Sequence, residues 1–226
     1  MIYKFFILCK FKMNNHNKNI ANQYNLIYKS FDTSRFRIWN NVKLFLSNYK
    51  HNDTLLDCGC GNGKNMMYAN NLGYNCEGYD ISENLLNICI SKNLNVYYSD
   101  VLNMNLNIKY DKIIAIAVLH HLETLEEQIL AIHNLLKCLK ENGLLLVSFW
   151  SMEKNFKYTI NEKNKNDYRN FDKGPNLVDW KLDKNTIIKR YYYIHDYDSI
   201  LELVKKINVK YNITWELQNW FIIFYK

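Results

Sequence analysis

Residues 54–63 read Thr-Leu-Leu-Asp-Cys-Gly-Cys-Gly-Asn-Gly, an apolar strand that runs directly into three alternating glycines. A second short strand ends in Asp80, about where nucleotide-binding folds place an acid that holds a ribose. Glycine lets the backbone approach a ligand where a Cβ atom would clash. The helix that opens at Asn62 points its N-terminal amides and positive dipole end toward that ligand. The stretch therefore predicts an α/β nucleotide-binding fold.

The spacing of the glycines separates the cofactor classes. The third glycine follows one intervening residue, whereas the dinucleotide fingerprint has two, and the absence of Gly-Lys-Ser/Thr excludes a Walker-type phosphate loop. The remaining pattern, Asp-x-Gly-x-Gly-x-Gly over 57–63, is typical of enzymes that use S-adenosylmethionine. A glycine turn in an ordinary α/β protein is the alternative, and the strand before the loop and Asp80 after it argue against that alternative.

Strands and helices alternate from Thr54 onward, which is typical of a parallel sheet with helices on both faces. Two helices over 22–50 are expected to cap the sheet. A polar insertion over about 151–185 precedes a last strand–helix–strand unit. This order predicts the fold of class I S-adenosylmethionine-dependent methyltransferases, a doubly wound, mostly parallel seven-stranded sheet with an antiparallel last strand. The elements are expected near these residues: strands at 54–58, 75–80, 94–99, 111–118, 143–150, 187–194 and 213–225, and helices at 62–72, 83–91, 123–140 and 197–207.

The length of 226 residues fits one domain with a sizeable core. We expect this domain over 21–226, with residues 1–20 as a disordered extension whose apolar part is too short to span a bilayer. The net charge of +7 favours a polyanionic partner. The six cysteines form no Cys-x-x-Cys pair, so we predict free thiols of a reducing compartment and no metal site. We expect a cytoplasmic location, with the nucleus as a second one, and no membrane partner.

The glycine loop supplies the candidate site for the amino-acid tail of S-adenosylmethionine. Gly59, Gly61 and Gly63 leave room for the tail next to the backbone. Asp57, at the end of the strand, can orient the loop or bind the positive ammonium group of S-adenosylmethionine.

Later strand ends supply the rest of the predicted cofactor site. Asp80, followed by Ile81, can accept hydrogen bonds from both ribose hydroxyls. Asp100 is placed to bind the adenine amino group with Val101 against the ring, although a turn residue is the alternative for Asp100. Ala117 lies at the carboxyl end of the fourth strand, where open α/β sheets bind ligands.

The side of the cavity that would receive the acceptor is less clear from the pattern. His120 and His121 follow the fourth strand, and one of them could act as a base or simply pack. The segment 151–193 interleaves cations with aromatic residues, as unpaired RNA requires. A solvated insertion, in which acidic residues dilute the charge, fits the same composition equally well. Representative residues of this segment are Lys154, Arg169, Lys189 and Arg190, with Tyr158, Trp180 and Tyr191.

Short motifs along the chain carry a resemblance to a known family. They are Ser34-Arg35-Phe36 with Trp39, then Asp57–Lys64, Ala115–His121, Phe149–Glu153, Leu177–Trp180 and Lys189–Tyr192. With these motifs the chain resembles, over about residues 24–226, the eukaryotic tRNA methyltransferases that esterify 5-carboxymethyluridine at the wobble position. The same domain occurs in animal AlkB-like fusion proteins. The chain departs from the family at Asp179, where proline is usual, and at Tyr193, where histidine is common.

The resemblance implies an activity and its site residues. S-adenosylmethionine would methylate the carboxylate of 5-carboxymethyluridine in a tRNA anticodon loop, and an ionised carboxylate requires no strong base. The catalytic work would then be alignment. Arg35 and Arg190 would grip the carboxylate or nearby phosphates, while His120 and Tyr191 would shape the base pocket. The resemblance also implies a small zinc-binding activator protein that covers an apolar edge of the sheet.

Other functions stay open beside this one. A small-molecule O- or N-methyltransferase of the same fold would use His120 or His121 as its base. A catalytically silent RNA-binding scaffold would keep only the fold, and the intact glycine loop with Asp80 and Asp100 argues against silence.

Overall fold

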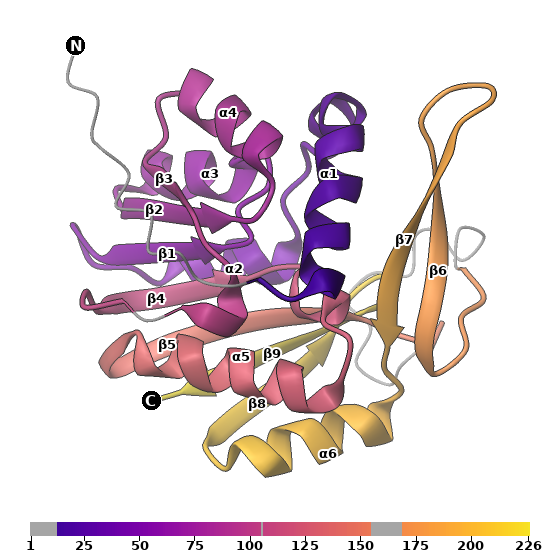
Figure 1. Ribbon diagram of the computed structural model, residues 1–226. Coiled ribbons are helices and arrows are strands. Elements are labelled where there is room, and N and C mark those ends of the chain that lie inside the picture. The colour runs from indigo at the N-terminus through magenta and orange to yellow at the C-terminus, as the bar shows by residue number, and fades with distance from the viewer. Residues whose placement is uncertain (1–12, 105, 155–168) are drawn as a thin grey trace.

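The computed structural model describes residues 13–104, 106–154 and 169–226 (Figure 1). Seven strands form the main sheet in the order β3-β2-β1-β4-β5-β9-β8. β1, β2, β3, β4 and β5 pair in parallel, whereas β9 runs antiparallel to both β5 and β8. The predicted doubly wound sheet with an antiparallel last strand is therefore confirmed. The strands of this sheet are β1 (Thr54–Cys58), β2 (Asn75–Asp80), β3 (Val96–Tyr98), β4 (Tyr110–Ala115), β5 (Leu139–Trp150), β8 (Lys210–Trp215) and β9 (Asn219–Tyr225).

Helices cover both faces of the sheet because consecutive strand residues point to opposite sides. Leu56 on β1 packs into the core with α5 and α6, while its neighbour Leu55 packs into the core with α2 and α3. The helices are α1 (Asn15–Ser34), α2 (Asn40–Ser47), α3 (Lys64–Leu72), α4 (Glu83–Ser91), α5 (Leu125–Lys137) and α6 (Tyr197–Ile207), with short 3₁₀ turns η1 (Val101–Asn103) and η2 (Leu119–His121).

The first helix corrects the expected disordered extension over residues 1–20. α1 begins at Asn15, because the side chain of Asn14 accepts a hydrogen bond from the Asn17 backbone amide and caps the helix. Met13 and Ile20 are buried, so this part of the chain belongs to the folded domain. Residues 1–12 lie outside the described residues.

The expected strand at 187–194 and helix at 197–207 are confirmed as β7 and α6, but the last third of the chain differs from the expected strand–helix–strand unit in how its strands pair. β6 (Gly174–Lys181) and β7 (Ile187–Ile194) form a separate antiparallel hairpin, which stands beside α1 in Figure 1. β6 also occupies the end of the expected insertion at 151–185, of which 155–168 lie outside the described residues. The expected strand at 213–225 is instead the β8–β9 hairpin, because Leu217 and Gln218 adopt left-handed backbone conformations and reverse the chain.

Candidate active site

The carboxyl ends of the parallel strands open onto a cavity of about 1270 Å³. Single small-molecule sites commonly measure about 300–1,000 Å³, so this cavity has room for a second reactant. The glycine loop and α1 form one side of the wall. The β7 strand and the 216–219 turn between β8 and β9 contribute to the other.

The glycine loop takes its shape from backbone that only glycine adopts easily. Gly59, Gly61 and Gly63 all have positive φ angles, and Gly59 and Gly61 line the cavity. A Cβ atom on Gly59 would lie 2.2 Å from a methyl carbon of Val118, so the loop needs glycine there for packing. Gly63 does not line the cavity, since it caps the start of α3.

Two buried carboxyl groups lie at the ends of β1 and β2. Asp80 lines the cavity and accepts hydrogen bonds from the backbone amides of Gly61 and Ser82, each at 2.8 Å. Burial raises the pKa of Asp80. Asp57 lies behind the loop and is fully buried, and its burial together with the charge of Asp80 raises its pKa to about 7. Neither Asp57 oxygen has a hydrogen-bond partner within normal geometry among the described residues, although the charge of Lys64 and the side chain of Asn65 oppose the rise in the pKa of Asp57.

The predicted adenine end lies farther along the same wall, which Ile81 and Val101 also line. Asp100 is buried there and accepts a hydrogen bond from the Asn17 side chain at 2.8 Å. Ala117 lines the cavity in a left-handed conformation, and its amide donates to the Ser148 hydroxyl. Asn17 was not predicted, because it falls in the stretch expected to be disordered.

The acceptor side of the cavity carries two arginines around one indole. The guanidinium groups of Arg35 and Arg190 lie 4.9 and 4.6 Å from the ring of Trp180. Arg190 is 2% exposed, and its Nε atom has no hydrogen-bond partner among the residues that the structure describes. Burial, reinforced by the charge of Arg190, lowers the pKa of Arg35. Among the described residues no Asp or Glu forms an ion pair with either arginine, so the pair is suited to binding an anion.

A third arginine and an aromatic stack extend this wall. Trp150 stacks on Tyr192 with ring centroids 4.1 Å apart, and the Arg169 guanidinium lies 5.0 Å from the Trp150 ring. Gln218 fixes the backbone of Arg169 through hydrogen bonds to both its amide and its carbonyl. The interleaving of cations and aromatics in the sequence fitted such a surface and a solvated insertion equally well, and it did not indicate which residues line the cavity.

The structure corrects the expected wall residues in two places. His121 and Tyr192 line the cavity, whereas His120 and Tyr191 do not. Tyr192 shares a face of β7 with Arg190 because side chains two apart on a strand point the same way. Tyr191 instead donates its hydroxyl hydrogen to the Glu123 carbonyl, and His120 is buried between Tyr192 and Trp150.

His121 is held as a neutral hydrogen-bond acceptor. Its Nδ1 atom lies 2.7 Å from the Tyr191 carbonyl oxygen, which can only accept, so Nδ1 carries the hydrogen. Nε2 therefore accepts the hydroxyl hydrogen of Tyr24 at 2.8 Å. Burial lowers the pKa of His121 to about 3. Both ring nitrogens are thus occupied within the protein, which argues against a role as general base.

Asp179 and Tyr193, where the chain departs from the family pattern, do not line the cavity. Asp179 pairs across the hairpin with Lys189, and Tyr193 pairs with Pro175. Val178 and Arg190 form the neighbouring pair on the opposite face. The two departures therefore leave the described cavity wall unchanged. Tyr158 lies outside the described residues.

In the part of the chain that the structure describes, no group of three or more His, Cys, Asp or Glu side chains is placed to hold a metal ion. Within the same residues, no helix has the length and apolar character needed to cross a membrane.

Residues 31–203 match a family described as a methyltransferase domain, and the match covers more than half of the chain. The chain belongs to this methyltransferase family. This methyltransferase is 35% identical over 139 residues to the tRNA (carboxymethyluridine(34)-5-O)-methyltransferase of Arabidopsis thaliana, covering 60% of this chain and 33% of that protein. It is 32% identical over 153 residues to a Mus musculus protein with the same enzyme name, covering 66% of this chain and 22% of that protein. The methyltransferase thus spans a third or less of the length of these relatives.

Solved structures show the same fold at low sequence identity. The DhpI–SAH complex aligns with a TM-score of 0.69 at 8% identity, covering 94% of this chain and 97% of the other. An S-adenosylmethionine-dependent methyltransferase from Methanosarcina mazei aligns with a TM-score of 0.63 at 14% identity, covering 84% and 98%. These likenesses confirm the predicted fold class.

Proposed function

We propose that this chain transfers a methyl group from S-adenosylmethionine to the carboxylate of 5-carboxymethyluridine at the wobble position of tRNA. The observation that carries the proposal is the placement of Arg35 and Arg190 on the cavity that the glycine loop also lines, with no carboxylate partner for either within residues 13–104, 106–154 and 169–226. The relatives named as tRNA carboxymethyluridine methyltransferases support the same substrate.

The described residues fit S-adenosylmethionine. A carboxylate has about four lone-pair sites, and the backbone amides of Gly61, Ser82 and Ile81 do not occupy all of those of Asp80. The buried Asp80 can therefore also accept the ribose hydroxyls. Asp57 places a second negative charge near the loop, where the cationic end of the cofactor would lower the cost of burying it. When bound, the cofactor would supply an electrophilic methyl group.

The acceptor side fits a carboxylate substrate. The substrate carboxyl group is ionised near neutral pH, and two guanidinium groups can hold it in a fixed orientation. The neutral His121 cannot take part as a free base, because it already accepts from Tyr24. Small-molecule methylation through a histidine base is therefore the weaker alternative.

The positive charge of the arginines on the cavity suits a polyanionic substrate. Arg35, Arg169 and Arg190 carry three positive charges on the cavity, and one carboxylate would neutralise one of them, so positive charge remains for a neighbouring phosphate. We further propose a cytoplasmic location, with the nucleus as a second one. We also propose a small zinc-binding activator on an edge of the sheet, where β3 and β8 are the outer strands. Monodisperse protein that is fully active alone would argue against the activator.

The test compares two neighbouring substitutions on β7. Arg190→Ala should abolish methylation of tRNA that contains 5-carboxymethyluridine, while S-adenosylmethionine binds with nearly unchanged affinity. Lys189→Ala is the matched control, because Lys189 is exposed and lies on the opposite face of the strand. Retained methylation in the Arg190 variant would refute the proposed anion site, and loss of cofactor binding together with activity would indicate misfolding.

A further inference from the structure

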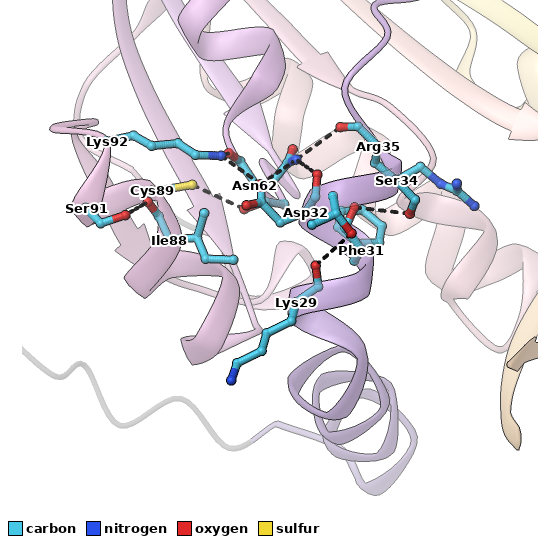
Figure 2. A network of polar contacts seen from close by, with 12 residues as sticks. Lys29, Phe31, Asp32, Ser34, Arg35, Asn62, Ile88, Cys89, Ser91 and Lys92 are labelled. Atoms are coloured by element: carbon cyan, nitrogen blue, oxygen red, sulfur yellow. Dashed lines mark hydrogen bonds and ion pairs between the residues drawn. The ribbon is translucent and has the colours of Figure 1, made fainter. Parts of the chain in front are cut away.

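One side chain of the glycine loop joins the loop to the end of α1. The Asn62 side-chain amide donates hydrogen bonds to Asp32 Oδ1 and to the Arg35 carbonyl oxygen, each at 3.0 Å (Figure 2). Asn62 is buried and lines the cavity. Arg35 follows α1 directly and carries its guanidinium to the acceptor side beside Trp180. A single amide therefore connects the loop of the methyl donor with the backbone of an arginine proposed to hold the acceptor.

Lys92 contacts both Asp32 and Asn62. Its ammonium group donates to Asp32 Oδ1 at 2.8 Å and to the Asn62 backbone carbonyl at 3.0 Å (Figure 2). Asp32 lies in the last turn of α1, where the helix dipole disfavours a carboxylate. The hydrogen bond from Lys92 nevertheless lowers the pKa of Asp32. Since the Asp32 carboxylate only accepts, the nitrogen of the Asn62 amide must face it and the Arg35 carbonyl.

The ion pair itself contributes little to folding. The Lys92 and Asp32 side chains are 28% and 32% exposed, and exposed pairs contribute about 0–1 kcal/mol to stability. The ion pair instead orients the side-chain amide of Asn62, which lies between the glycine loop and the backbone of Arg35.

We propose that Asn62 is a positioning residue that fixes the distance between the bound methyl donor and the anion held by Arg35. Asp32 and Lys92 orient its amide, and ordering of the glycine loop by the cofactor passes through Asn62 to residues 34–37. This inference rests on the proposed function for its kinetic readout, but its structural readout does not depend on the acceptor.

The kinetic test compares the single substitution Asn62→Asp with an exchange of the Asn62 and Asp32 side chains. Asn62→Asp places a carboxylate against Asp32 and the Arg35 carbonyl. We expect kcat to fall by about 10-fold or more, since a small misplacement of the reacting groups costs that much. The combined variant Asp32→Asn with Asn62→Asp restores a hydrogen bond between the two side chains and keeps a carboxylate beside Lys92. It does not restore the bond to the Arg35 carbonyl. We therefore expect Tm to recover while kcat stays low. Recovery of kcat together with Tm would overturn the proposal.

Substitution of Lys92 gives a milder second test. Lys92→Met should lower kcat about threefold with an unchanged Kd for S-adenosylhomocysteine, and Lys92→Arg should restore it. Lys140→Met is the matched control, because it removes the lysine of another half-exposed ion pair, with Asp111, away from the cavity. A parallel loss of cofactor affinity and kcat would mean that the contact only holds the cofactor, and would overturn the proposal.

Amide hydrogen exchange separates this inference from the proposed function. In the wild-type protein, S-adenosylhomocysteine should slow exchange over residues 34–37 as well as in the glycine loop. In the Asn62→Asp variant the protection of 34–37 should disappear while that of the loop remains. If 34–37 are unaffected in the wild type, the inference fails even where tRNA is methylated. If the coupling is present and tRNA is not methylated, only the proposed function fails.

Discussion

Replacement of Asp57 by asparagine should stabilise the ligand-free protein at alkaline pH. Asp57 is fully buried behind the glycine loop, and burial, with the nearby charge of Asp80, raises its pKa from 3.8 to about 7. The folded protein therefore binds more protons than the unfolded chain between about pH 4 and pH 7, and this group lowers stability as pH rises through that window. Above pH 7 a buried carboxylate remains without a hydrogen-bond partner among the described residues.

The size of the effect follows from the change in pKa. The pKa of Asp57 rises by roughly three units, and at about 1.4 kcal/mol per unit this rise destabilises the folded protein by up to about 4 kcal/mol at pH 8. Asp57→Asn keeps the shape of the side chain and removes the charge. The variant should thus unfold up to roughly 10 °C higher than the wild type at pH 8, and at nearly the same temperature at pH 4.

Thermal unfolding at pH 4, 6 and 8 measures this directly. Asp111→Asn is the control of opposite sign: burial raises the pKa of Asp111, but hydrogen bonds from Lys140 and Thr54 outweigh this and lower it to about 2. That variant should lose stability at pH 8. An Asp57→Asn variant that is destabilised equally at all three pH values would refute the account of a buried carboxylate whose charged form is disfavoured by burial. S-adenosylmethionine should stabilise the wild type more at pH 8 than at pH 6, and should lose this pH dependence in the variant.

Three further outcomes are expected. Asn17→Ala should weaken S-adenosylmethionine binding about 10-fold in calorimetry, because Asp100 loses a buried hydrogen-bond partner; unchanged affinity would remove Asp100 from the cofactor site. At saturating cofactor, kcat should show no acidic limb near pH 6.5, since His121 stays neutral; a limb that disappears in His121→Gln would restore a histidine base. The rate with tRNA should fall steeply between 50 and 200 mM salt, whereas a salt-independent rate would favour a small-molecule acceptor.

The cofactor side of the cavity could be predicted from local sequence. Glycine spacing and strand ends are short-range features, and the expected bounds of β1 and β2 agree with the structure. Gly59, Gly61, Asp80 and Asp100 accordingly lie where the pattern placed them, on the cavity wall.

The acceptor side could not be predicted to the same detail. Neighbouring residues of one type, such as Tyr191 and Tyr192, differ only in which face of the strand they occupy. The pairing of β7 with β6 and the packing of η2 decide that face. The turn at Leu217 contains neither glycine nor proline, so nothing in the local sequence marked the end of β8. The role of Asn17 depends on a contact with Asp100 that spans 83 residues of the chain.

The most direct test of the central claim is nucleoside mass spectrometry of tRNA from cells depleted of this protein. The account predicts that 5-carboxymethyluridine accumulates and that its methyl ester disappears, with recovery by the wild-type chain and by Lys189→Ala but not by Arg190→Ala. An unchanged level of the methyl ester after depletion would contradict the proposed reaction.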